Sequence, residues 1–255
     1  MYPNGGFPPW NGLRPASTLG AMVFFEAAYA ASERPVRLID ADPELFEGLN
    51  GAAPRRGVHD LTVAVVRVPA GRWHVDGGRS DERLGMLVLD GLIVRSIEAA
   101  GQRRAELLGP GDVIRPWDTG DDELARLRAD VAWTVLEPAR LADLDGAFAS
   151  AACRAPQVFS ELLVRAIRRS QRMALQMAIG DMRRVEERLI ALFAHLGDRW
   201  GRVTPEGIHV PVRLTHELIA LLIGAQRPTV TTGLGELRRQ GRLVKRADRT
   251  WLLPG

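Results

Sequence analysis

The chain has 255 residues, of which 46% are hydrophobic and 25% are charged. That composition is typical of a soluble globular protein and excludes a disordered or fibrous chain, and the length suits one large domain or two ordinary ones. Cys153 is the only cysteine, which excludes an intrachain disulfide and an iron–sulfur cluster held by several cysteines of one chain. We expect a cytoplasmic protein and assign it no cofactor.

Positive charge is concentrated at the C-terminus. The net charge of the chain is +3, yet the residues from Arg213 onward carry eight basic side chains against three acidic ones. This asymmetry suggests that the C-terminal part contacts a polyanion. Charge alone leaves an ordinary basic surface as an equally good interpretation.

The first 35 residues are expected to form a poorly ordered segment. Residues 1–18 are rich in proline and glycine, and the apolar run from Leu19 to Ala31 is interrupted by Glu26. The run is too short to span a bilayer and matches a secretory signal poorly. We therefore expect no association with a membrane.

From about residue 36 to residue 145 the pattern is that of short strands separated by turns. Leu61–Val68 alternates in polarity, and two apolar runs flank Asp90-Gly91, which is a hairpin signal. Gly109–Asp112 forms another tight turn, and Val131–Leu136 ends the series. Several strands at this spacing predict an antiparallel barrel or sandwich.

From about Pro156 to Leu196 the chain has the composition of a helix, and a break near 180–184 indicates two helices or one kinked helix. Apolar side chains recur there at steps of four and three residues, as in a coiled-coil seam. The seam consists of Phe159, Leu163, Ala166, Ser170, Met173 and Met177. Packing against the chain's own strands is the simpler interpretation. We favour pairing with a second copy, because a helix that links two domains has little of its own chain to cover it.

Residues 214–240 carry the signals of a helix-turn-helix. Thr215 suits the N-cap of a short apolar helix, and Gly224 suits its end, where glycine tolerates a positive φ. Pro228 fits the first turn of the next helix, whose apolar side chains recur at i, i+4 and i+7. The alternating residues 241–253 then form a hairpin, or wing. In such a unit the second helix enters the major groove of DNA.

DNA contacts are predicted for polar residues at the start of the second helix, for cations near the tip of the wing and for two flanking residues. Arginine binds guanine through two hydrogen bonds, threonine offers a methyl or hydroxyl group, and wing cations neutralise phosphates. The predicted contacts are Gln226, Arg227, Thr229, Thr231, Thr232, Thr215, Arg238, Lys245 and Arg246. The alternative is a pair of core helices and a hairpin with exposed charges.

The sequence LTHELIALLIGAQRPTVTTGLGELRRQGRL, residues 214–243, is very similar to the helix-turn-helix of the catabolite-activator/FNR (Crp-Fnr) family of bacterial transcription regulators. Residues 184–201 resemble the helix after that family's dimerisation helix, and residues 85–95 and 107–114 resemble strands of its cyclic-nucleotide-type β-roll. The resemblance implies an α+β fold with a β-roll over 36–153, a dimerisation helix over 154–183 and a winged helix-turn-helix over 184–255. It also implies a homodimer, a palindromic operator on double-stranded DNA, contact with RNA polymerase and a pocket for an unknown small-molecule effector.

By this resemblance, Arg227 occupies the position of the family's leading base-contacting arginine. Pro228 and Thr232 stand where many members carry a glutamate and a second arginine, so the operator is expected to differ from the best-known family sequence. Gly233 replaces a usual alanine or aliphatic residue, which costs about 1 kcal/mol of helix stability.

The β-roll departs further from the family. Nucleotide-binding members carry a Gly-Glu pair soon after this turn and then an arginine followed by a small hydroxyl residue; that arginine holds the cyclic phosphate. Here Asp112 leads into Arg115-Pro116-Trp117-Asp118, and no such pair follows. We therefore expect the usual cyclic-AMP contacts to be absent. Arg115 and Trp117 are candidates for an altered effector pocket, although such residues are more often a surface arginine and a core tryptophan.

The five histidines show no metal-ligand spacing and no catalytic motif is present, so we expect neither a metal site nor an enzyme. Two alternatives stay open: an enzyme with a β-barrel active site and an accessory winged helix, and a winged-helix module that binds proteins. The missing motifs count against the first. The polar residues from Arg227 to Thr232 and the basic wing favour DNA over the second.

Overall fold

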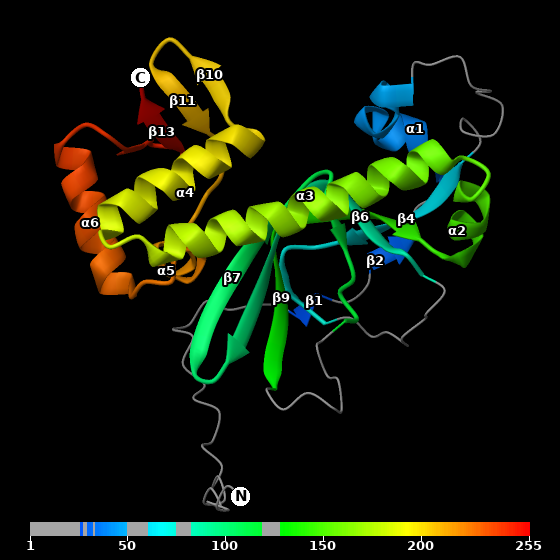
Figure 1. The fold of residues 1–255 in the computed structure, drawn as a ribbon, viewed down its shortest axis with the longest axis horizontal. Coiled ribbons are helices and arrows are strands. Elements are labelled where there is room, and N and C mark those ends of the chain that lie inside the picture. The colour runs from blue at the N-terminus through cyan, green and yellow to red at the C-terminus, as the bar shows by residue number, and fades with distance from the viewer. Residues whose placement is uncertain (1–25, 28–29, 33, 50–60, 75–82, 119–127) are drawn as a thin grey trace, which may run out of the picture.

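The computed structural model describes residues 26–27, 30–32, 34–49, 61–74, 83–118 and 128–255. A sheet domain forms the N-terminal part, the helix α3 (Pro156–Asp181) runs along it, and a smaller head lies at the far end of α3 (Figure 1). The expected order of antiparallel strands, long helix and C-terminal helix-turn-helix is confirmed. Most of the predicted poorly ordered segment lies outside the described residues. Two short strands, β1 (Glu26–Ala27) and β2 (Ala30–Ser32), fall within it.

Among the described residues, nine strands form the sheet domain, and their pairings are antiparallel apart from that of β1 with β5. The other strands are β3 (Val36–Arg37), β4 (Thr62–Val68), β5 (Gly71–Trp73), β6 (Gly85–Ala99), β7 (Gln102–Leu108), β8 (Val113–Ile114) and β9 (Ala129–Leu144). The two longest, β6 and β9, pair from Gly85↔Leu144 to Ala99↔Ala129. This long ladder is the central feature of the sheet domain.

The predicted hairpin at Asp90-Gly91 is wrong, because β6 passes through both residues and turns only at Ala100-Gly101. The pair forms a bulge, where the register of β6 against β9 shifts. Gly91 has a φ of 92°, and a Cβ there would lie 2.5 Å from the carbonyl oxygen of Pro138 on β9. Only glycine suits this close approach. An Asp-Gly pair thus marks a bulge here, since a third strand is already paired alongside.

The helices up to residue 200 are α1 (Leu38–Ala41), a 3-10 helix (Pro43–Leu49), α2 (Gly146–Ala152), α3 and α4 (Val185–Trp200). The break between α3 and α4 falls at residues 182–184, so the predicted joint near 180–184 is confirmed. One face of α3 buries Val158, Leu162 and Ile179 against its own chain. No helix among the described residues is both long and apolar enough to cross a membrane.

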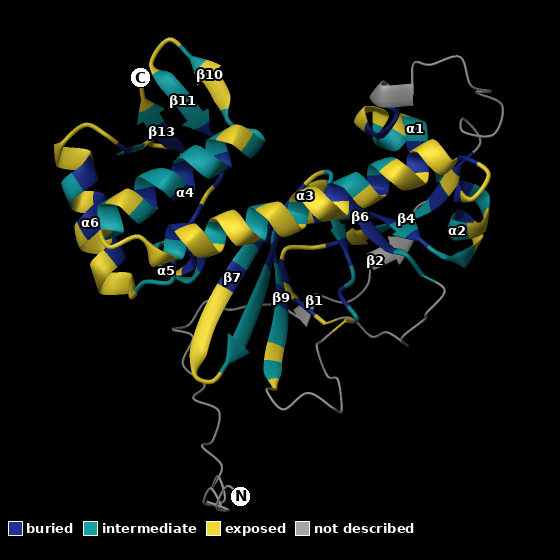
Figure 2. Cartoon of the chain, in the orientation of Figure 1, coloured by how far each residue is buried: buried dark blue, intermediate teal, exposed yellow. Residues whose placement is uncertain are grey.

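The predicted seam of α3 lies on its other face. Leu163 is 54% exposed, Met177 is 72% exposed, and Phe159 is exposed as well. Exposed residues recur along the whole helix in Figure 2. Packing against the chain's own strands therefore does not account for these exposed side chains, although Ala166, Ser170 and Met173 of the same seam line a cavity against the sheet domain.

The head combines α4 with two further helices and a four-stranded sheet in the order β10-β11-β13-β12. Its remaining elements are β10 (Arg202–Thr204), β11 (Gly207–Val210), α5 (His216–Ile223), α6 (Arg227–Arg239), β12 (Val244–Lys245) and β13 (Trp251–Pro254). The predicted wing, β12 and β13, is confirmed. The hairpin β10–β11 was not expected from the sequence, and it pairs with β13 to complete the sheet.

One apolar core joins the head to the sheet domain. Leu92 and Leu107 of the sheet are buried together with Phe193 of α4 and with Ile219 and Leu222 of α5. Burial of shared apolar surface holds the two parts together but does not fix their relative orientation, because the hydrophobic effect is non-directional. The orientation is fixed by polar contacts, which the same junction also contains.

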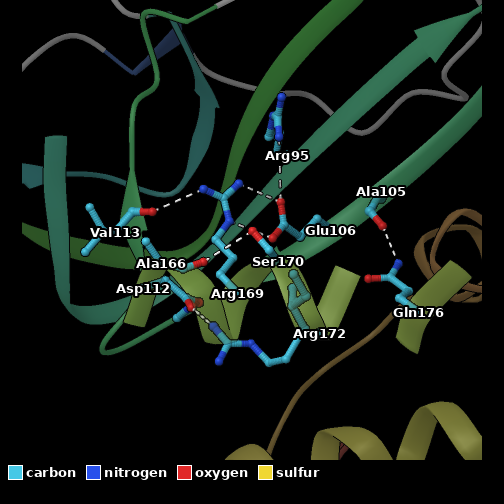
Figure 3. A network of polar contacts seen from close by, with 12 residues as sticks. Arg95, Ala105, Glu106, Asp112, Val113, Ala166, Arg169, Ser170, Arg172 and Gln176 are labelled. Atoms are coloured by element: carbon cyan, nitrogen blue, oxygen red, sulfur yellow. Dashed lines mark hydrogen bonds and ion pairs between the residues drawn. The ribbon is translucent and has the colours of Figure 1, made fainter. Parts of the chain in front are cut away.

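A buried ion cluster centred on Asp112 supplies those polar contacts. Asp112 ends the Gly109–Asp112 turn and is 1% exposed. Its carboxylate accepts hydrogen bonds from Arg199 at 2.6 Å, from the Gly109 N–H at 2.9 Å and from Arg172. Figure 3 shows the pair with Arg172. Because Arg172 lies on α3 and Arg199 on α4, one carboxylate connects the sheet domain, the long helix and the head.

Replacing Asp112 with asparagine is expected to destabilise the protein by roughly 2–4 kcal/mol, because two largely buried guanidinium groups lose their counter-charge. Denaturant unfolding measures the change. The control is Asp40→Asn, which removes an exposed pair with Arg37 and should cost less than about 1 kcal/mol. Equal losses of unfolding free energy in the two variants would show that the Asp112 cluster stabilises the fold no more than an exposed ion pair does.

Candidate nucleic-acid interface

The first helix of the helix-turn-helix, α5, begins and ends at the predicted residues. The Thr215 hydroxyl accepts a hydrogen bond from the Leu218 N–H at 3.1 Å, as an N-cap does. Gly224 ends the helix with a φ of 64° in the left-handed region. The turn then places Gln226 as the residue that precedes α6.

The second helix, α6, packs on α4 through its apolar side and through a glycine. Val230, Leu234 and Leu237 are buried. A Cβ on Gly233 would lie 3.0 Å from side-chain atoms of both Leu189 and Val185 on α4. The absence of a side chain at Gly233 lets α6 approach α4 closely, although glycine lowers the helix propensity. With this side of α6 packed on α4, the opposite side faces solvent.

All nine residues predicted to contact DNA are exposed. They lie on α6, on the turn before it, at the N-cap of α5 and on the wing, which Figure 2 shows as an outer edge of the head. Thr231 and Thr232 donate their hydroxyl hydrogens to carbonyl oxygens one helical turn back, at 3.1 and 3.2 Å. Their oxygens keep lone pairs that can accept further hydrogen bonds.

Cations from two elements converge beside α5. Burial lowers the pKa of His216, and the charges of Lys245 on the wing and Arg227 on α6 lower it further. The charges of both cations therefore act on one ring at the start of α5. The His216 ring also bonds to the Thr231 hydroxyl, with 3.0 Å between Nδ1 and Oγ1. Sequence reasoning missed His216, because a histidine in the first turn of a helix carries no signal of its own.

The other predicted cations differ in their surroundings. Arg246 pairs with Glu206 at 3.1 Å at an exposed position, and Lys245 lies 5.3 Å from the centre of the Trp251 ring. Within the part of the chain that the structure describes, Arg227 and Arg238 take part in no ion pair. The charge of these two arginines is therefore available to a ligand.

The two candidate effector residues are placed differently from each other. Arg115 donates to Asp118 at 2.7 Å and to the carbonyl oxygen of Arg83 at 3.0 Å, and it lines a cavity of about 360 Å³ between the sheet domain and α3. Trp117 lies 5.7 Å below the Arg115 guanidinium and packs on an apolar core. It is not among the residues that line this cavity.

No group of three or more histidine, cysteine, aspartate or glutamate side chains able to hold a metal ion occurs among the described residues.

Residues 187–253 match the family described as Crp-like helix-turn-helix domain. This C-terminal part of the chain is therefore similar to Crp-like helix-turn-helix domains. Regulatory protein CysR of Synechococcus elongatus is 34% identical over 145 residues, which cover 55% of this chain and 61% of that protein. The chain thus spans less than two thirds of the length of this relative.

Solved structures of other proteins share the fold. A CooA mutant from Carboxydothermus hydrogenoformans has a TM-score of 0.56 at 19% identity, covering 82% of this chain and 90% of that chain. A cysteine-to-serine variant of CprK complexed with OCPA has a TM-score of 0.55 at 15% identity, covering 86% of this chain and 90% of that chain. At these identities the likeness concerns the fold alone.

Two glycines of α6 provide a matched test of the packing on α4. Gly235 is exposed with open space around it, so Gly235→Ala should stabilise the protein by about 1 kcal/mol through helix propensity. Gly233→Val should lower the thermal midpoint, because its side chain must displace Leu189 and Val185. A rise of the midpoint in both variants would show that α4 and α6 are not closely packed at Gly233.

Proposed function

We propose that this chain is a sequence-specific transcription regulator of the Crp-Fnr type that inserts the N-terminal end of α6 into the major groove of double-stranded DNA. The observation that carries the proposal is the exposure of this end, with Arg227 free of ion pairs among the described residues and Lys245 acting with it on the His216 ring. A helix end flanked by cations suits a groove bordered by phosphates.

Each exposed residue has a role that follows from its chemistry. Arg227 binds a guanine edge through paired hydrogen bonds, and Thr229, Thr231 and Thr232 contact neighbouring bases through methyl groups or lone pairs. Phosphates are contacted by the remaining five residues, namely Thr215, Gln226, Arg238, Lys245 and Arg246. Arg246 exchanges its exposed pair with Glu206 for a phosphate at little cost, because such pairs contribute little stability.

The same surface argues against the two other function classes. Among the described residues, the large hydrophobic side chains that are exposed lie on α3, on β10 and at Met182, and none lies on α5, α6 or the wing. Protein-binding surfaces rely on buried apolar contacts, so this polar face fits a polyanion better than a protein. The enzyme alternative finds no support in the arrangement of the head.

Dimerisation through α3 belongs to the same proposal. The exposed seam from Phe159 to Met177 pairs with its counterpart on a second copy, as in a coiled coil. The division into a β-roll over 36–153, a dimerisation helix over 154–183 and a winged helix-turn-helix over 184–255 then gives two reading heads. A symmetric pair of heads reads a palindromic operator. Contact with RNA polymerase and a cytoplasmic location follow for a bacterial regulator of this type.

The β-roll is proposed to bind a small-molecule effector, and to do so without the usual cyclic-AMP contacts. The Arg115 guanidinium is already bonded to Asp118 and to a backbone carbonyl. No arginine–hydroxyl pair follows the Gly109–Asp112 turn in the sequence. The cavity beside Arg115 therefore differs chemically from a cyclic-phosphate site.

Arg227→Ala is expected to weaken binding to a duplex selected by the wild-type protein by roughly 1–3 kcal/mol, and to relax the base preference at one position of each half-site. Fluorescence anisotropy at fixed salt measures the affinity. Arg103→Ala, at the tip of the β6–β7 hairpin and far from the head in sequence, is the control and should leave affinity unchanged. Unchanged affinity in Arg227→Ala would count against the groove assignment.

Leu163→Asp is expected to convert a dimer into a monomer, because two carboxylates would face each other in the seam. Sedimentation velocity at micromolar concentration measures the change. The control is Leu175→Asp, since Leu175 is 49% exposed but lies off the seam by helical spacing. A wild-type monomer, or dissociation in both variants, would contradict the seam.

Titration of the wild-type protein with cyclic AMP is expected to release no measurable heat, since the arginine that grips the cyclic phosphate is missing from its place. Isothermal calorimetry makes the measurement. Saturable binding at micromolar concentration would show that Arg115 or another arginine substitutes for the missing contact.

A further inference from the structure

We propose that a second cavity, between the β6–β7 hairpin, α3 and α5, binds a small, uncharged and mainly apolar molecule. This site is separate from the cavity beside Arg115 and from the DNA interface. Its volume is about 460 Å³, which lies within the range of roughly 300–1,000 Å³ typical of small-molecule sites. Junctions between domains are also where such sites tend to occur.

Apolar side chains supply much of the wall. Ile97 comes from the hairpin, Met173 and Met177 come from α3, and Leu222 and Ile223 come from α5. Methionine side chains are flexible and polarizable, so they adapt to ligands of irregular shape. The wall therefore favours a compact apolar ligand.

The charged groups of the wall cancel one another. Arg95 and Arg104 stand against Glu106 and Asp181, two charges of each sign. The Glu106 carboxylate is bound by Arg169 through two hydrogen bonds of 2.8 Å. Because Arg169 binds Glu106 and Arg95 lies 3.9 Å from the same carboxylate, a charged ligand would have to displace existing ion pairs, and its desolvation would oppose binding.

The same ion pair has one member in the lining of each cavity. Glu106 faces the junction cavity and Arg169 lines the cavity beside Arg115, as their pairing in Figure 3 lets the reader follow. A molecule in one cavity therefore does not occupy the other. Arg95 and Met173 line both, so the sites are neighbours with a common wall.

A molecule in this cavity would contact the β6–β7 hairpin, α3 and α5, whose relative positions set the orientation of the head. The Gln176 side-chain N–H groups already bridge the carbonyl oxygens of Ala105 on β7 and Leu222 on α5. A ligand beside this bridge stabilises the docked arrangement, because it binds that arrangement and not one in which α5 has moved away. Leu222 and Ile223 immediately precede the turn into α6.

The test is a fluorescence titration of the purified full chain with N-phenyl-1-naphthylamine, an uncharged apolar probe. We expect saturable binding of one probe per chain. Ile97→Trp, which fills the cavity, should raise the dissociation constant by about tenfold or more. Gly180→Ala adds one methyl group 3.7 Å from the Ile223 carbonyl oxygen, in a helix that tolerates alanine, and should weaken binding by a smaller factor without risk to the fold.

Leu163→Asp is the control for the exposed seam of α3 and should leave probe binding unchanged. Absence of saturable binding would overturn the proposal. So would loss of binding in Leu163→Asp with none in Ile97→Trp or Gly180→Ala, because the probe would then occupy the seam. The measurement uses no DNA, so it stands or fails independently of the proposed DNA binding, and Arg227→Ala should bind the probe as the wild type does.

Discussion

The buried carboxylate of Asp112 fixes how the head is mounted on the rest of the molecule. It satisfies a backbone N–H of its own turn and the guanidinium groups of Arg172 and Arg199. Apolar burial alone would let the head slide over β7, whereas charged hydrogen bonds have direction. Trp200 adds a steric constraint, because a Cβ on Gly109 would lie 2.7 Å from its ring. The turn and the C-terminal end of α4 therefore fit in one way.

The orientation of the proposed DNA-binding surface depends on how the head is held. Arg199 also donates to the Leu107 carbonyl oxygen on β7, and α5 shares the apolar core beside it. With α4 and α5 held, Gly233 lets α6 lie close to α4 and presents the polar side of α6 to solvent. Asp112 directly precedes Val113, which lines the cavity beside Arg115. A shift of that cavity wall thus has a short covalent path to the contact that orients the head.

The local features of the head were predictable because their causes are local. The N-cap at Thr215 and the left-handed Gly224 each follow from one residue in its immediate context. The prediction at Asp90-Gly91 was wrong because an Asp-Gly pair suits both a hairpin turn and a β-bulge. Which of the two forms depends on pairing with β9, which lies far along the chain. The contact of Asp112 with Arg199 joins residues 87 positions apart and has no local signature. The short strands β10 and β11 gain their stability from pairing with β13, which the sequence pattern does not reveal.

We propose that two copies of α6 read DNA from one face of the duplex. A methylation-protection footprint of the wild-type protein, on genomic fragments that it selects, tests this arrangement. We expect two protected major-groove segments with their centres about 10 base pairs apart, or a multiple of that spacing, related by a two-fold axis. Protection of a single segment, protection confined to the minor groove, or failure to enrich any sequence would contradict it.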